Sequence, residues 1–252
     1  MRVVDLKEPT LLRRAIRILI GVAIGLGLLA GGIWVLIHTL GEREALYQGK
    51  SLYYWSEQIK SQNTAASNQA SLVLNQEIIP RLTKTMFEDT SDSRLRVALV
   101  ENLNGLPGVN ILFRMADGRR GGAAAAFGEF GPPAEAAVPA LLQALQGHDL
   151  VVRRPAAVSL GKIHAKPGVI IPLLIRYLEE DDLRESAAEA LGEFGGLSKA
   201  AIPRLLSLLK VPDKDLHTAV EEALKDIDPD AAAQAGVRIG ARSPSLPKTN
   251  DH

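Results

Sequence analysis

The stretch DLVVRRPAAVSLGKI, residues 149–163, contains the pattern that decides the fold of this 252-residue chain. Arg153 is followed seven residues later by Leu160 and ten residues later by Ile163, and Ala156 lies one helical turn before Leu160. Residues four apart lie on the same face of a helix, so the large apolar side chains form a core stripe and the alanine admits a neighbouring helix. The stretch therefore predicts a helix that packs closely against others.

The same pattern occurs five times, and its regular spacing predicts repeated units. The copies are Arg96, Leu103 and Leu106; Arg120, Phe127 and Phe130; Arg153, Leu160 and Ile163; Arg184, Leu191 and Phe194; His217, Leu224 and Ile227. The last four residues in the leucine position are 33, 31 and 33 residues apart. A period of this length is typical of stacked helical units, none of which buries its apolar face alone. We expect an all-α fold, a right-handed α-solenoid of about four to six helical hairpins over residues 64–240.

Glycines, prolines and charges recur in register with this pattern. Three glycines are expected near the end of the first helix of each unit, where glycine tolerates left-handed dihedral angles. Three prolines are expected in the first turn of the second helix, where a missing N–H costs nothing. Acidic residues eleven positions before the leucine position are expected to form charge ladders with the arginines of neighbouring units. These residues are Gly128, Gly161 and Gly192; Pro139, Pro172 and Pro203; and Asp92, Asp149, Glu180 and Asp213.

The run from Asp149 to Ile163 resembles the HEAT repeat, and more narrowly the HEAT-like repeats of the phycobilisome lyase type. The resemblance covers about residues 92–230. Proteins of this kind are mostly scaffolds, so the resemblance implies binding rather than one specific chemistry. Another repeat enzyme, deoxyhypusine hydroxylase, binds iron through His-Glu dipeptides, and no histidine of this chain is followed by glutamate.

Composition excludes several classes of function. Lys+Arg and Asp+Glu both number 29, so the basic excess needed to bind nucleic acid is absent. The chain has no cysteine, which excludes disulfides, thiolate metal sites and a cysteine nucleophile. The histidines are too dispersed to suggest a metal site. We therefore expect no cofactor, no metal and no catalytic residues.

An uncharged stretch near the N-terminus, ILIGVAIGLGLLAGGIWVLI at residues 18–37, is long enough to span a bilayer. It predicts a transmembrane helix over residues 18–40. The basic segment 1–17 predicts a cytoplasmic N-terminus and a periplasmic solenoid. A cleaved secretory signal is the alternative. Gly21, Gly25 and Gly32 lie on one face of the predicted helix, which suggests a homodimer through that helix.

Two further segments flank the repeats. Residues 41–63 are rich in aromatic side chains, and they either cap the solenoid or lie on the membrane surface. Residues 241–252 have little to bury and are expected to form a disordered tail.

The partner surface is expected on the concave face, which in HEAT-type arrays is lined by the second helices. Aligning these helices on their prolines gives a mildly basic strip with an apolar centre. Its residues are Arg81, Lys84, Leu173, Arg176, Tyr177, Arg204 and Leu208. Glu189 is expected on the opposite, convex side.

These observations lead to a functional hypothesis with two alternatives. The main hypothesis is a membrane-anchored, non-catalytic scaffold that holds a protein partner on its concave face. One alternative is a bilin-lyase-like or metal-dependent enzyme of the HEAT-like repeat family. The other is a structural homo-oligomer assembled through the membrane helix.

Overall fold

The structure is a computed structural model that describes residues 45–105, 111 and 114–237. The α-helices are α2 (Leu52–Ile59), α3 (Thr64–Val73), α4 (Ile79–Glu88), α5 (Arg94–Asn104), α6 (Ala116–Phe130), α7 (Val138–Gln146), α8 (Leu150–Ile163), α9 (Pro167–Tyr177), α10 (Arg184–Glu193), α11 (Ile202–Leu208), α12 (Lys214–Ile227) and α13 (Pro229–Gln234). A π-helical turn, η1 (Leu74–Ile78), leads into α4, and two 3-10 helices, η2 (Pro132–Ala137) and η3 (Gly195–Ala201), precede α7 and α11. Within the described ranges the helices fall into two compact units, one holding α5 and the other holding all the rest.

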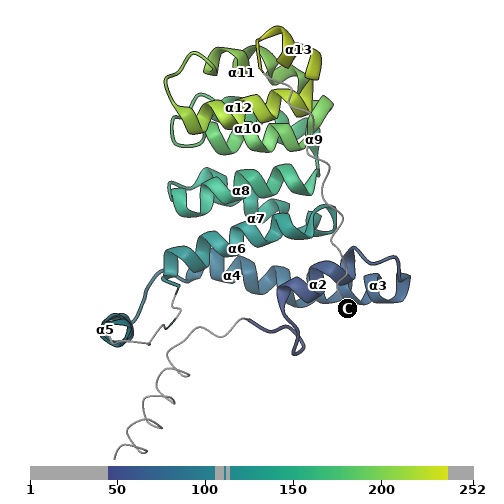
Figure 1. The fold of residues 1–252 in the computed structure, drawn as a ribbon. Helices are drawn as coiled ribbons and strands as arrows, with labels where there is room; N and C mark the ends of the chain where they lie inside the picture. The colour runs from purple at the N-terminus through teal and green to yellow at the C-terminus, as the bar shows by residue number, and fades with distance from the viewer. Residues whose placement is uncertain (1–44, 106–110, 112–113, 238–252) are drawn as a thin grey trace, which may run out of the picture. The chain divides into compact units, whose positions relative to one another are not determined.

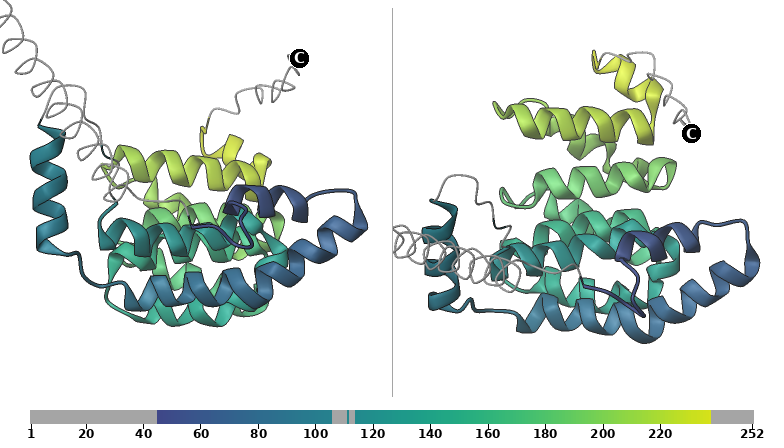
Figure 2. Two further views of the ribbon diagram at one scale, coloured as in Figure 1. Left: turned by 90° about the horizontal axis from the view of Figure 1, so that it is seen from below. Right: turned by 60° about the horizontal axis from the view of Figure 1, so that its bottom comes forward.

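The larger unit consists of two layers of helices. The first layer contains α6, α8, α10 and α12, and the second layer contains α4, α7, α9 and α11. Successive first-layer helices pack directly on one another, and each second-layer helix packs on the first-layer helix that follows it. Figure 1 shows the first-layer helices stacked from α6 to α12, and Figure 2 shows the same stack from two further directions. The predicted all-α helical-repeat fold is confirmed.

The predicted core residues are buried along the whole first layer. Phe127, Leu160, Leu191 and Leu224 are each 0% exposed, and the apolar residues three positions later are at most 3% exposed. Each position repeats once per unit, so the buried side chains form one continuous core cluster. This continuity is the reason that a single unit would not be stable alone.

Acidic residues of the repeat pattern begin the first-layer helices. The Asp149 carboxylate accepts a hydrogen bond from the N–H of Val151 at 3.0 Å, and the Asp213 carboxylate accepts from the N–H groups of Asp215 and Leu216. These bonds satisfy amides that have no partner inside the helix. The acidic position therefore fixes where α8 and α12 start.

Glycines at the centre of the first layer allow the helices to touch. A Cβ added at Gly161 would lie 2.7 Å from Cα of Ala190, and one added at Gly192 would lie 2.9 Å from Cα of Ala223. Both glycines are inside regular helix, so the prediction that they supply left-handed dihedral angles is wrong. The left-handed residues come three positions later, at Gly131, His164 and Gly195. The regular spacing of these glycines thus reflects close helix approach and not chain reversal.

The hairpins start with a second-layer helix, whereas the sequence analysis started each hairpin with the arginine-bearing helix. α7 packs on α8, and α9 packs on α10, through short connections. The links from α6 to α7 and from α10 to α11 are longer, because they contain η2 and η3, whereas α8 and α9 are joined by a short connection. Counting the second-layer helix as the first of each hairpin leaves the length of the repeat unchanged.

The first copy of the pattern does not form a repeat of the array. Arg96 and Leu103 lie in α5, within the separate unit that holds Asp92–Arg114, and α4 packs directly on α6. Only 24 residues separate Leu103 from Phe127. This spacing leaves no room for a second-layer helix, so residues 92–114 are an insertion between α4 and α6.

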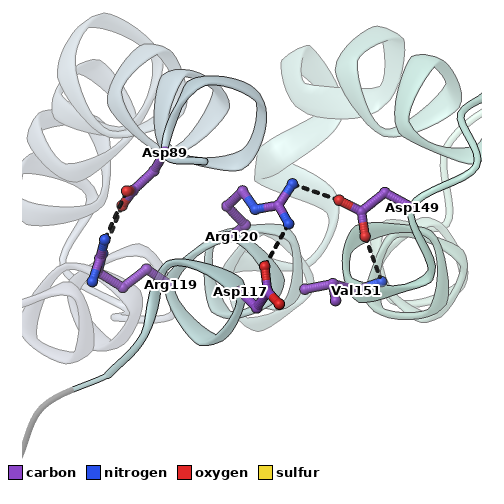
Figure 3. Close-up of polar contacts among 6 residues, drawn as sticks. All are labelled: Asp89, Asp117, Arg119, Arg120, Asp149 and Val151. Carbon is purple, nitrogen blue, oxygen red and sulfur yellow. Dashed lines mark hydrogen bonds and ion pairs between the residues drawn. The ribbon is translucent and has the colours of Figure 1, made fainter. Parts of the chain in front are cut away.

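Charge ladders join neighbouring units, as the sequence predicted. Nη1 of Arg120 lies 2.5 Å from Asp149 at the start of the next first-layer helix, and Arg153 donates to Glu180 at 2.9 Å. Figure 3 shows Arg120 between Asp117 and Asp149. It also shows Arg119 and Asp89, which connect α6 to α4 through two hydrogen bonds of 2.6 and 2.7 Å. The hydrogen bond from Arg119 holds the pKa of the Asp89 carboxyl below its usual value.

The aromatic segment at residues 45–63 contributes to the core of the larger unit. Tyr47, Trp55 and Ile59 are buried in the same cluster as the repeats. The indole N–H of Trp55 donates to the carbonyl of Tyr47 at 2.9 Å, which holds the turn against α2. Tyr53 and Tyr54 remain exposed on the opposite side of α2.

The membrane prediction requires correction. Across the described ranges, no helix has the length and apolar character needed to cross a bilayer. The predicted transmembrane helix at residues 18–40, with Gly21, Gly25 and Gly32, lies outside these ranges. The predicted membrane-anchored periplasmic solenoid is therefore corrected to an all-α helical-repeat array over the described residues. The predicted lipid partner and the predicted homodimer through a membrane helix have no support in it either.

Candidate functional site

A partly open groove lies between α10 and α12, two neighbours in the first layer. We call it the acidic groove. It is lined by Glu185, Glu189, Glu193, Asp215, Thr218, Ala219, Glu222, Ala223 and Asp226. It encloses about 380 Å³, within the range of small-molecule sites.

The acidic groove arises from the repeat pattern itself. Glu185, Glu189 and Glu193 are four residues apart, so they lie on one face of α10, opposite its buried alanines and leucine. The approach of Gly192 to Ala223 brings α12 so close that its own acidic face forms the other wall. Few apolar atoms remain between the two rows of carboxylates.

Glu189 lines the groove, and the pKa of its carboxyl is raised above the usual value. Partial removal of water raises the pKa of its carboxyl, and the nearby Glu193, Glu185 and Glu222 raise it further. Lys162 on α8 acts in the opposite direction. A carboxyl in this environment can accept hydrogen bonds from N–H donors, and it holds a proton at a higher pH than an ordinary glutamate does.

This shift predicts a pH-dependent effect of Glu189→Gln. A raised pKa in the folded state means that Glu189 favours folding while it is protonated, and that this contribution is lost as pH rises through the raised pKa. We expect the variant and the wild type to have similar urea midpoints at pH 4, and the variant to be the more stable at pH 8. Glu135→Gln, at an exposed position in η2, is the matched control. Equal midpoints for Glu189→Gln and wild type at pH 8 would contradict the described electrostatics.

The groove shows no sign of a metal centre. Among the residues that the structure describes, no group of three or more histidine, aspartate or glutamate side chains is arranged to hold a metal ion. Lys162 pairs with Glu129 at 3.6 Å and Arg154 pairs with Asp182 at 3.6 Å, so cations of α8 border the acidic rows. The first-layer surface thus offers hydrogen-bond acceptors on α10 and α12 and cations on α8.

The predicted partner residues lie on the second layer, on α4, α9 and α11. Tyr177 and Leu208 are only 6% and 5% exposed and belong to the core, and Leu173 packs partly against it. The hydroxyl of Tyr177 donates to the carbonyl of Leu145, and its ring lies under the Arg153 guanidinium.

The four basic residues of the predicted strip are exposed: Arg81, Lys84, Arg176 and Arg204. Two of them form ion pairs, Lys84 with Glu88 at 3.8 Å and Arg204 with Glu179 at 3.6 Å. Arg81 lies over the ring of Tyr47. Partner binding by these basic residues stays a prediction.

Helix spacing favours the first layer as the inner surface of the larger unit. In a curved stack the inner layer has the smaller spacing between successive helices. Here the backbone contacts at Gly161 and Gly192 are between first-layer helices, and no comparably close packing joins successive second-layer helices in the described chain. The sequence analysis instead expected the second helices of the units to line the inner, concave surface, and it placed Glu189 on the outer side. A row of acids at four-residue spacing was the signal that could have identified the groove.

Comparison with known proteins identifies the class of repeat. Residues 117–192 match HEAT repeats, and residues 183–210 match the PBS lyase HEAT-like repeat. Residues 117–210 therefore consist of HEAT-like repeats.

These repeats resemble phycobilisome lyase subunits. A relative named "Phycocyanobilin lyase subunit alpha" from Nostoc sp. is 34% identical over 90 residues, in a match that covers 32% of this chain and 32% of the relative. The match thus spans about a third of that protein's length.

Two solved structures are similar over most of the chain. One is the complex of CpcE and CpcF of phycocyanin lyase from Nostoc sp. PCC7120, with 20% identity and a TM-score of 0.45, covering 75% of this chain and 69% of that chain. The other is an engineered protein with 15% identity and a TM-score of 0.38, covering 73% of this chain and 85% of that chain.

The similarity changes the functional interpretation. The prediction of a non-catalytic membrane scaffold requires correction, because the relative is named a lyase subunit, and the described residues contain no helix that could cross a membrane. The prediction that the chain is not an enzyme is corrected by the name of the relative alone, and the activity of this chain is a matter of proposal. The similarity agrees better with the bilin-lyase-like alternative.

Proposed function

We propose that this chain is a lyase-type subunit that binds a bilin chromophore on its first-layer surface and works with a protein partner. One observation carries the proposal: residues 183–210, which match the PBS lyase HEAT-like repeat, include α10 and therefore one wall of the acidic groove. The 34% identity with a protein named as a lyase subunit supports both the chromophore class and the need for a partner.

The chemistry of the surface suits such a ligand. A bilin is an open-chain tetrapyrrole with N–H donors along its length and carboxylate side chains. Glu189 and Glu222 offer acceptors for the N–H groups, and Lys162 and Arg154 offer cations for the carboxylates. The chain has no cysteine, so it cannot hold the chromophore through a thioether of its own. We therefore expect non-covalent binding, which would leave the chromophore free to pass to another protein.

A titration of the full chain with phycocyanobilin tests this proposal. We expect a saturable change in the absorption spectrum at one chromophore per chain, and release of the chromophore to an apo-phycobiliprotein subunit added afterwards. A spectrum that does not change at any chain concentration would overturn the proposal. A bound chromophore that the apo-protein cannot remove, alone or with a lyase partner subunit, would contradict the transfer role.

A further inference from the structure

Asn104 is the last residue of α5, and Gly105 follows it just outside the helix. Every other asparagine of the chain precedes a residue that has a side chain. Glycine leaves its own backbone nitrogen unshielded, so an Asn-Gly pair loses its side-chain amide more readily than other pairs do. The backbone does not itself require this glycine, because its φ lies outside the left-handed region. Deamidation chemistry is therefore concentrated at one position of the chain.

The side-chain amide of Asn104 forms two hydrogen bonds with the backbone of Ile111. Its Oδ1 accepts from the N–H of Ile111 at 2.6 Å, and its Nδ2 donates to the carbonyl of Ile111 at 3.1 Å. Both ends of the amide are thus used, each by the complementary backbone group. Ile111 is 4% exposed, whereas Asn104 and Gly105 are both exposed. An exposed amide therefore holds a buried residue to the end of α5.

Loss of this amide follows a defined route. The backbone nitrogen of Gly105 attacks Cγ of Asn104 and gives up its proton to the solvent. A bond forms between that nitrogen and Cγ, the bond from Cγ to Nδ2 breaks, and ammonia leaves. Water then opens the cyclic imide at either of its carbonyl groups, which gives aspartate or isoaspartate. Water is the only co-reactant, and nothing is oxidised or reduced.

The folded chain opposes the ring closure in three ways. The N–H of Gly105 donates to the carbonyl of Glu101 at 3.2 Å, so the attacking nitrogen is occupied. Asn104 is held in the helix, and closure of the imide requires its backbone to leave the helical dihedral angles. The two bonds to Ile111 also fix the side chain that would have to turn. The reaction therefore requires the end of α5 to open locally.

We propose that Asn104 is a deamidation site whose rate is set by its pairing with Ile111, and that deamidation permanently releases this pairing. A carboxylate at position 104 accepts hydrogen bonds and cannot donate them. It therefore loses the bond to the carbonyl of Ile111 and places a negative charge beside that oxygen. Isoaspartate in addition inserts a carbon atom into the backbone at the end of α5. This inference does not depend on the proposed function.

Peptide mass spectrometry of the full chain after incubation at pH 8 measures the reaction. Trypsin releases residues 97–114, and the same peptide made synthetically is the unprotected reference. We expect Asn104 to be converted in both, about tenfold or more slowly in the folded chain, because at least two hydrogen bonds must open. Asn102, whose Nδ2 donates to the carbonyl of Ala98 at 2.6 Å, is the internal control and should keep its amide. Equal rates in chain and peptide, or conversion of Asn102 ahead of Asn104, would overturn the proposal.

Three variants separate the pairing from the reaction. Ile111→Pro removes the N–H that binds Oδ1, so its rate of deamidation should approach that of the peptide. Gly105→Ala keeps the pairing and shields the attacking nitrogen, so it should slow the reaction in chain and peptide alike. Asn104→Asp reproduces one product, and it should speed hydrogen–deuterium exchange over residues 97–114 while α6 to α12 exchange as in wild type. A wild-type rate in Ile111→Pro, or wild-type exchange in Asn104→Asp, would contradict the assigned role of the pairing.

Discussion

Gly161→Ala should destabilise the chain by about 2–3 kcal/mol, although alanine is the better helix former by about 1 kcal/mol. The added Cβ would lie 2.7 Å from Cα and 2.8 Å from the carbonyl oxygen of Ala190. Both atoms belong to backbone, so no side chain can turn away and α8 must separate from α10. Separation would loosen the core contacts that pass between the two units.

Urea denaturation measures this effect, and the chain offers a matched control. Gly168 is an exposed helical glycine in α9 whose added Cβ would meet nothing within 4 Å. Gly168→Ala should therefore be neutral or stabilising by less than about 1 kcal/mol. If Gly161→Ala were stabilising to the same degree, the first-layer helices could not be packed at the described spacing.

The triple variant Glu185→Gln, Glu189→Gln and Glu222→Gln should weaken phycocyanobilin binding by about 100-fold or more. A hydrogen bond to a charged group contributes about 1.5–3 kcal/mol, and each 1.4 kcal/mol is a factor of ten in affinity. Glutamine keeps the shape of each side chain and removes its charge. Because the three carboxylates repel each other, the variant should unfold at a higher urea concentration than wild type at pH 8.

A second-layer variant provides the control for this experiment. Arg81→Gln with Lys84→Gln changes the charge of two exposed residues on α4 and leaves the acidic groove intact. We expect its affinity for the chromophore to equal that of wild type within a factor of two. An affinity loss in the second-layer variant, with none in the triple variant, would place the binding surface on the other side of the array.

The repeat architecture could be predicted from the sequence because its signal recurs. The buried positions of Phe127, Leu160, Leu191 and Leu224 repeat at nearly constant intervals. In each unit an alanine lies about one helical turn before this position and another apolar residue lies about one turn after it. The ion pair between Arg120 and Asp149 could be predicted from the same regular spacing, because the arginine and acidic positions recur in step with the buried ones. These features depend on local spacing, which a sequence displays directly.

The proposed binding surface could not be predicted in the same way. Which layer lies inside depends on how closely successive helices approach, and the 2.7 Å contact at Gly161 becomes visible only when two units are stacked. The burial of Tyr177 depends in turn on Arg153 and Leu145 of a neighbouring helix pair. The pattern also counted its first copy, at Arg96 and Leu103, as a repeat, although the spacing of only 24 residues to Phe127 already indicated a shortened second helix or a loop in that unit.

Hydrogen–deuterium exchange with and without phycocyanobilin tests the central claim most directly, because it reports on both layers in one experiment. We predict that the chromophore slows exchange in α10 and α12, with a smaller effect at the C-terminal end of α8 and none in α4, α9 or α11. Unchanged exchange at saturating chromophore, or protection confined to the second layer, would contradict a bilin-binding first-layer surface.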